Sequence, residues 1–103
     1  METVGVFIEH RTLPGQRARV FEIWKTHMAP AVAGNSGHLD YFYGLADHDP
    51  DTLLVFQRYS DRLAAEAFLA HPSYAVYLAE VERLLAGPPI VRSAAIGWAK
   101  SDL

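Results

Sequence analysis

The stretch Leu53–Leu85, LLVFQRYSDRLAAEAFLAHPSYAVYLAEVERLL, decides the fold of this chain. It begins inside an apolar strand, predicted over Thr52–Tyr59, that ends in an aromatic residue. Ser60-Asp61 then offers a side-chain oxygen to cap a helix, which we expect to run to about Ala70. A strand that leads at once into a helix is typical of one half of a split βαβ domain.

A second helix follows the break at His71-Pro72. Proline is tolerated at the first position of a helix because the missing N–H would have no partner there. Apolar residues then recur at intervals of three and four positions, which predicts one buried helix face. They are Tyr74, Tyr77, Leu78, Val81, Leu84 and Leu85. Gly87-Pro88-Pro89 ends this helix, and Ile90–Ala99 is predicted to be the last strand.

The first half of the chain repeats the same arrangement. Val4–Thr12 is predicted to be a strand, and Gln16 to about Ala33 a helix with apolar residues at near-helical spacing. His38–Ala46 is predicted to be a strand that the turn 47–51, DHDPD, joins to the third strand. The predicted fold is therefore α+β and ferredoxin-like, βαββαβ, with a four-stranded antiparallel sheet and helices on one face.

Length and composition limit the function classes. The 103 residues form one predicted domain over 1–103. The net charge is −3 and the nine basic residues are dispersed, so no nucleic-acid surface is predicted. There is no cysteine, no apolar run of the roughly 20 residues that span a bilayer, and no signal core near the N-terminus. We therefore expect a soluble cytoplasmic protein that contacts neither nucleic acid nor membrane.

The first and third predicted strands carry apolar residues on both faces, such as Ile8 and Phe7 in the first strand. Helices cover only one face of the predicted sheet, so the other apolar face needs a second cover. We therefore expect a homodimer formed through the sheet faces.

With this order of elements, the chain resembles the antibiotic biosynthesis monooxygenase family of dimeric α+β barrels. The residues that carry the resemblance are EHRTLPG at 9–15, Asp40-Tyr41, QRYSD at 57–61, the small residues Ala64, Ala65 and Ala67, and Pro72. The resemblance implies oxygenation of a small aromatic quinol, anthrone or polyketide-like substrate by dioxygen, without metal or flavin. In agreement, the sequence contains no nucleotide-binding glycine motif and no zinc-protease motif.

The chain departs from the family pattern at several positions. Phe68 and Ser73 stand where many members have histidines, and Gln57 replaces the usual glutamate of the third strand. Polar residues of members that act on tricyclic aromatics fall near Val55, Ala65 and Ala79.

Two histidines, His71 and His10, are the candidate catalytic residues, because a neutral imidazole can accept a phenolic proton at physiological pH. His71 can alternatively be an exposed residue at a helix start, and His10 can pair with a carboxylate at a rim. The candidate substrate-binding residues are aromatic: Tyr59, Tyr41, Tyr43, Tyr74, Phe68 and Trp24. Their alternative role is ordinary packing in the core or at the dimer interface.

Other polar groups have structural interpretations. His38 is expected near the sheet edge, His27 at a helix surface, and His48 in a solvated turn. The aspartates of the turn 47–51 are expected to diverge and lack the spacing of a calcium loop, so no metal site is predicted.

Two other functions remain open at this stage. One is an isomerase or lyase of the same barrel architecture, which would move a proton without dioxygen. The other is a non-catalytic dimer that binds a small ligand.

Overall fold

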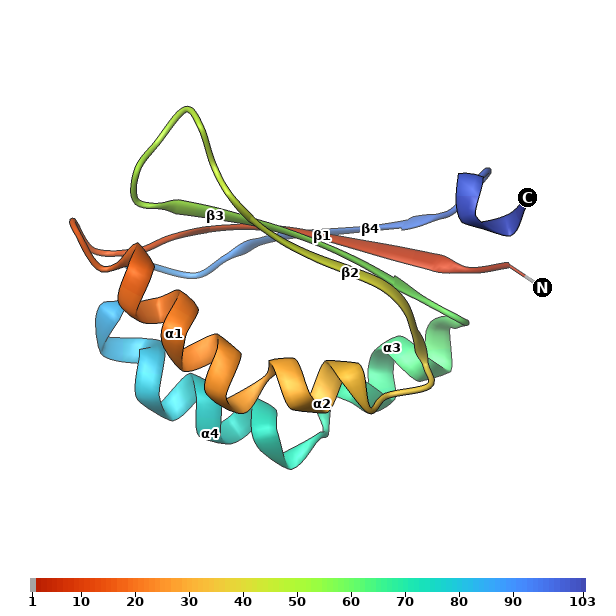
Figure 1. The fold of residues 1–103 in the computed structure, drawn as a ribbon, viewed down its shortest axis with the longest axis horizontal. Coiled ribbons are helices and arrows are strands. Elements are labelled where there is room, and N and C mark those ends of the chain that lie inside the picture. Colours follow the sequence, from red (N-terminus) through yellow and green to blue (C-terminus); the bar gives the residue numbers. More distant parts are fainter. Residues whose placement is uncertain (1) are drawn as a thin grey trace.

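The computed structural model describes residues 2–103 as a four-stranded antiparallel sheet with helices α1 to α4 on one face (Figure 1). The elements in chain order are β1 (Val4–Arg11), α1 (Arg17–His27), α2 (Ala29–Ala33), β2 (His38–Leu45), β3 (Thr52–Tyr59), α3 (Arg62–Leu69), α4 (Pro72–Val81), the short 3₁₀ helix η1 (Glu82–Leu84), β4 (Ile90–Ala95) and the 3₁₀ helix η2 (Lys100–Asp102). The strands lie in the order β2-β3-β1-β4. The ferredoxin-like α+β prediction is confirmed.

The local signals in the sequence account for both helices of the second half. The Asp61 carboxylate accepts a hydrogen bond from the Ala64 backbone N–H at 2.7 Å and so caps α3. His71 caps α4, and Pro72 occupies its first turn. None of the helices formed within residues 2–103 combines the length and the apolar content needed to cross a bilayer.

The helix predicted over 16–33 is divided in two. α1 ends at His27, and α2 begins at Ala29 with Pro30 in its first turn. A proline there lacks the N–H that a continuous helix would bond to the preceding turn. The sequence predicted one helix whose end Pro30 loosens, whereas the structure divides it into two helices just before Pro30. The break leaves Met28 buried between the two helices, in contact with the core.

The last strand is shorter than predicted. β4 ends at Ala95 rather than Ala99, and the chain then leads into η2. Arg58, which is 4% exposed, binds this segment through Asp102 at 2.6 Å and Ser101 at 2.8 Å. These polar contacts hold the C-terminal segment away from the strand direction that its apolar residues had indicated.

Two buried clusters fill the space between the sheet and the helices, because alternate residues of each strand point toward the helices. The first cluster consists of Val20, Ile23, Leu53, Val55, Val81 and Leu84. The second consists of Met28, Tyr59 and Phe68. Together they hold the sheet against the helices on both sides of the cavity described below.

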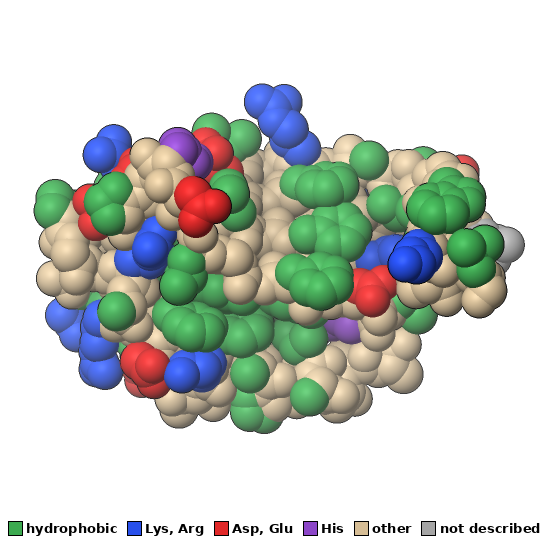
Figure 2. All heavy atoms as spheres, turned by 45° about the horizontal axis from the view of Figure 1, so that its top comes forward, with side chains coloured by type: hydrophobic (Ala, Val, Ile, Leu, Met, Phe, Trp, Pro, Cys, Tyr) green, Lys and Arg blue, Asp and Glu red, His purple; other side chains and the backbone are tan. Residues whose placement is uncertain are grey.

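The opposite face of the sheet, which we call the open face, is apolar and is not covered by α1 to α4 (Figure 1). Phe42, Phe56 and Phe7 lie in one row across β2, β3 and β1. The Phe7 and Phe56 rings are 4.9 Å apart, and Phe42 is 62% exposed. Figure 2 shows hydrophobic side chains gathered over this side of the molecule. The prediction of a second apolar sheet face is confirmed.

Candidate functional site

A cavity of about 360 Å³, which we call the aromatic cavity, lies between the sheet and the helices. This volume is in the range of small-molecule sites. The aromatic residues predicted to bind substrate all line it: Trp24, Tyr41, Tyr43, Tyr59, Phe68 and Tyr74. An adjoining hollow of about 350 Å³ shares Gln57 and Tyr59 with the cavity and extends toward Glu66 of α3. The fold thus brings residues from four strands and three helices into one chamber.

Burial keeps the phenols of this cavity protonated. It raises the pKa of Tyr59 to about 12 and that of Tyr77 to about 12, with a smaller contribution from the neighbouring Tyr74 phenol in both. Burial raises the pKa of Tyr41 and of Tyr43 still further. These hydroxyl groups are therefore hydrogen-bond donors at neutral pH and not proton acceptors.

His10 lines the aromatic cavity at its rim, beside Pro89 and Leu78. Its Nε2 lies 2.8 Å from the Gly87 carbonyl oxygen. A carbonyl oxygen only accepts hydrogen bonds, so in neutral His10 the proton sits on Nε2 and Nδ1 keeps its lone pair. Within residues 2–103, Nδ1 makes no hydrogen bond of its own. His10 is therefore a histidine of the cavity wall with a free acceptor nitrogen.

His71, the other candidate base, lies outside the aromatic cavity. Its side chain is exposed, and its Nδ1 accepts a hydrogen bond from the Ser73 backbone N–H at 3.1 Å. That nitrogen caps α4, so its lone pair is occupied. The remaining predicted surface histidines behave as expected: His27 pairs with Glu80 at 3.1 Å, and His48 is exposed in the turn.

His38 lies beside the cavity, surrounded by aromatic rings. Its ring centroid is 4.3 Å from that of Tyr59 and 4.5 Å from that of Phe68. Its Nε2 lies 3.1 Å from Gln57 Oε1, and Tyr59 donates its hydroxyl to the same oxygen at 2.5 Å. Burial lowers the pKa of His38, and the hydrogen bond to Gln57 offsets only part of this effect. His38 is therefore neutral at physiological pH.

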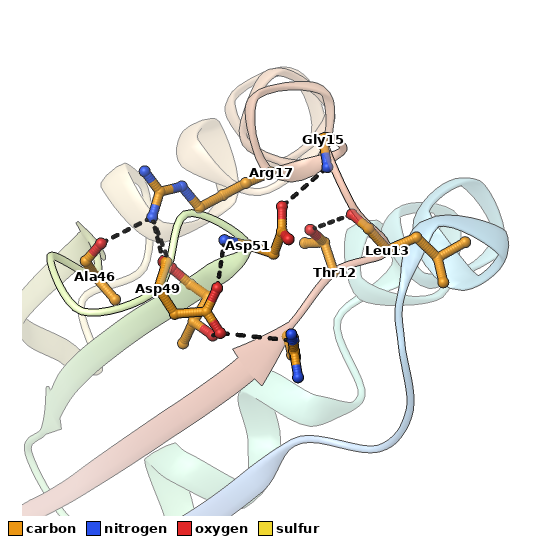
Figure 3. Close-up of polar contacts among 9 residues, drawn as sticks. Thr12, Leu13, Gly15, Arg17, Ala46, Asp49 and Asp51 are labelled. Atoms are coloured by element: carbon orange, nitrogen blue, oxygen red, sulfur yellow. Dashed lines mark hydrogen bonds and ion pairs between the residues drawn. The ribbon is translucent and has the colours of Figure 1, made fainter.

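The aspartates of the turn 47–51 stabilise the hairpin (Figure 3). The Asp51 carboxylate accepts from the Gly15 N–H at 2.9 Å, where Gly15 has a φ of 78° that favours glycine. The Asp49 carboxylate accepts a hydrogen bond from the Asp51 backbone N–H at 2.9 Å, and this bond lowers the pKa of Asp49. Asp49 also pairs with Arg11 at 3.5 Å. Asp49 and Asp51 thus each have partners within the hairpin and its surroundings.

Within the described range 2–103, no group of three or more histidine, aspartate or glutamate side chains is placed to hold a metal ion.

Comparison with known proteins identifies the family. Residues 3–80 match the antibiotic biosynthesis monooxygenase family. The chain belongs to this family. No curated protein matches the sequence. Its fold recurs in the solved structure of a "putative antibiotic biosynthesis monooxygenase" of Chloroflexus aurantiacus, with 21% identity, a TM-score of 0.80, and 94% of this chain and 95% of that one covered.

Two further structures share the fold. A protein of unknown function from Nitrosomonas europaea has 25% identity and a TM-score of 0.83, with 97% of this chain and 94% of that one covered. A protein from Caulobacter crescentus, described like the Chloroflexus one, has 17% identity and a TM-score of 0.86, with 92% and 90% covered.

Sequence reasoning missed His38 and Gln57 as site residues of this antibiotic biosynthesis monooxygenase family member. Strict alternation from Tyr41 would place Leu39 toward the helices and His38 on the open face. The structure has a register shift between His38 and Asp40, so that His38 pairs with Tyr59. Such a β-bulge turns a side chain to the other face of the sheet. The bulge leaves Leu39 without a partner in β3 and 45% exposed.

Proposed function

We propose that this protein is a monooxygenase that oxidises a small aromatic quinol, anthrone or polyketide-like compound with dioxygen, without a metal or flavin. The observation that carries the proposal is His10, a histidine with a free Nδ1 in the wall of a cavity lined by aromatic side chains. Membership of the antibiotic biosynthesis monooxygenase family supports the same chemistry.

The proposed reaction needs only proton transfer from the protein. His10 Nδ1 takes a proton from the substrate, and the resulting anion is rich enough in electrons to reduce dioxygen. One electron passes to dioxygen, and the radical pair combines to form a carbon–oxygen bond and a peroxide. The peroxide takes up a proton, and its O–O bond breaks as the same carbon loses its second hydrogen as a proton. For anthrone, the products are anthraquinone and water, and each product receives one of the two atoms of dioxygen.

The cavity supplies the remaining requirements. The Trp24 ring centroid lies 5.2 Å from that of Tyr41 and 4.9 Å from that of Tyr43, and these rings offer flat surfaces to an aromatic substrate. An apolar wall excludes water from the reactive anion, and the protonated tyrosines can donate hydrogen bonds to its oxygen.

We also propose that the protein forms a homodimer through the open face. A hollow of about 510 Å³ on that face is lined by apolar residues together with Glu9 and Arg92. In a two-fold interface each contact occurs twice. Glu9 of one copy can therefore pair with Arg92 of the other copy, and Arg92 of the first copy can pair with Glu9 of the second. The row of phenylalanines would then be buried at its centre, as is usual in homodimers.

Oxygen uptake by the purified protein tests the proposed reaction. The protein is freed of metal and flavin and mixed with anthrone or dihydroxynaphthalene, and spontaneous autoxidation is subtracted. Saturable uptake supports the oxygenase. Turnover under nitrogen would instead indicate the isomerase or lyase, and tight binding with no turnover in either gas would indicate a binding protein.

A further inference from the structure

Gln57 carries a side-chain amide whose orientation is fixed by the surrounding hydrogen bonds. Gln57 is 6% exposed and lines both the aromatic cavity and the adjoining hollow. Its Oε1 lies 2.5 Å from the Tyr59 hydroxyl and 3.1 Å from His38 Nε2. The orientation of this amide decides whether the cavity meets a donor or an acceptor at this point.

The donor and acceptor roles can be followed from the backbone. The Gly37 backbone N–H donates to Asn35 Oδ1 at 3.2 Å, so the Asn35 amide nitrogen is the atom that faces His38. That nitrogen only donates, so His38 Nδ1, 2.9 Å away, must accept. The proton of neutral His38 then sits on Nε2, which donates to Gln57 Oε1.

The Tyr59 hydroxyl reinforces this orientation. It remains protonated because burial raises the pKa of Tyr59 to about 12, and it donates to the same Gln57 oxygen. With two donors on Oε1, the Gln57 amide nitrogen is the atom left for other partners. Within residues 2–103 this nitrogen makes no hydrogen bond. Gln57 lines both the aromatic cavity and the adjoining hollow, so a ligand bound there can accept from this nitrogen.

We propose that the Gln57 amide N–H donates a hydrogen bond to an oxygen acceptor of the bound ligand, and that His38 is the positioning residue that holds the amide in this orientation. The site then selects an aromatic compound with a phenolate or carbonyl oxygen at this end. This inference rests on the proposed function for the class of ligand. A glutamate at position 57 would present an acceptor instead of a donor.

The ionisation of a bound phenol tests the inference without any turnover. Pentafluorophenol is titrated against the intact protein under nitrogen, and fluorine NMR reports the pKa of the bound phenol. A hydrogen bond to the charged oxygen favours the phenolate. We expect the pKa of the phenol bound to the wild-type protein to be lower than that of the free phenol. In Gln57→Leu the pKa of the bound phenol should be higher than in wild type, by an amount that changes the ionisation constant about tenfold.

Three variants separate positioning from general structural effects. Gln57→Glu should raise the pKa of the bound phenol more than Gln57→Leu, because a carboxylate repels the phenolate. His38→Ala should raise it as well, whereas His38→Gln, whose amide nitrogen can replace Nε2 as donor, should stay near the wild-type value. Circular dichroism checks that each variant folds.

Several results would overturn the inference. They are equal phenol pKa values in wild type, Gln57→Leu and His38→Ala, or no binding of pentafluorophenol to the wild-type protein. If Gln57→Leu does not fold, the two His38 variants decide by themselves. Normal phenol shifts without oxygen uptake would contradict the proposed oxygenase and leave the Gln57 inference standing.

Discussion

His38 and Gln57 lie 19 residues apart in the sequence, and a hydrogen bond of 3.1 Å joins His38 Nε2 to Gln57 Oε1. The contact depends on the β-bulge at Leu39, which turns His38 toward the helices. It therefore ties the wall of the aromatic cavity to a local irregularity of the edge strand β2.

The buried His38 should make stability depend on pH. Burial lowers its pKa from the ordinary value of 6.5, so the unfolded chain binds more protons than the folded one as pH falls below 6.5. The contribution of His38 to stability is thus complete above that pH and is lost as pH falls through the folded-state pKa. Tyr59 and Tyr41, its ring neighbours, remain uncharged in this range.

Urea unfolding at about pH 7.5 and about pH 5.5 measures this effect. The free energy of unfolding should decrease less between these conditions in His38→Gln than in wild type. His48→Gln, at an exposed turn position, is the matched control and should follow the wild type. An equal decrease in all three proteins would mean that His38 titrates as if exposed.

Replacement of His10 should reduce catalysis strongly. A positioned proton acceptor contributes about 10²–10⁴-fold, so His10→Leu should lower the rate of oxygen uptake with anthrone by this order. His48→Gln again serves as control. The measurement is kcat with saturating substrate, since binding by the aromatic wall should change little.

The same assay tests His71, the other candidate base predicted from the sequence. His71→Asn keeps a side chain able to cap α4 and should retain wild-type kcat, because His71 lies outside the aromatic cavity. Loss of activity in His71→Asn with full activity in His10→Leu would reverse this assignment.

The cap of α3 can be tested by stability. The Asp61 carboxylate accepts the Ala64 N–H, so Asp61→Ala should lower the free energy of unfolding by about 1 kcal/mol. Ser60→Ala is the matched control, because the Ser60 hydroxyl does not cap the helix. Equal losses in the two variants would show that Asp61 has no special role at this helix start.

The proposed dimer should depend on the open face. A charge in the centre of an apolar interface is desolvated without a partner, so Phe42→Asp should shift the protein from dimer to monomer. Leu63→Asp is the control: Leu63 of α3 is 76% exposed, so this variant should leave the dimer intact. Sedimentation velocity distinguishes the species, and a monomeric wild-type protein at micromolar concentration would contradict the proposal.

The helical spacing of apolar residues, the alternation of residues in the strands and the cap at Asp61 sufficed to predict the order of elements. Apolar residues on both faces of the first and third strands predicted the open face. These patterns also sufficed to gather the aromatic cavity residues, since Tyr41, Tyr43 and Tyr59 follow the simple alternation of their strands. Side chains that depend on an irregularity could not be predicted in this way.

His38 was missed because one unpaired residue, Leu39, inverts the alternation. The end of β4 was missed because the apolar residues after Ala95 continue the strand pattern, whereas the chain leads into η2, where Asp102 contacts Arg58, a residue distant in the sequence. The sequence placed His71 at a helix start, which agrees with its role as a cap of α4. Only the fold shows that His71 lies outside the aromatic cavity.

The most direct test of the proposed reaction is the origin of the oxygen in the product. Anthrone is oxidised by the metal- and flavin-free protein under isotopically labelled dioxygen, and mass spectrometry follows the label. The oxygenase mechanism predicts that one labelled atom appears in anthraquinone and the other in water, at a rate that His10→Leu lowers. An unlabelled product, or labelled product formed no faster than without protein, would contradict it.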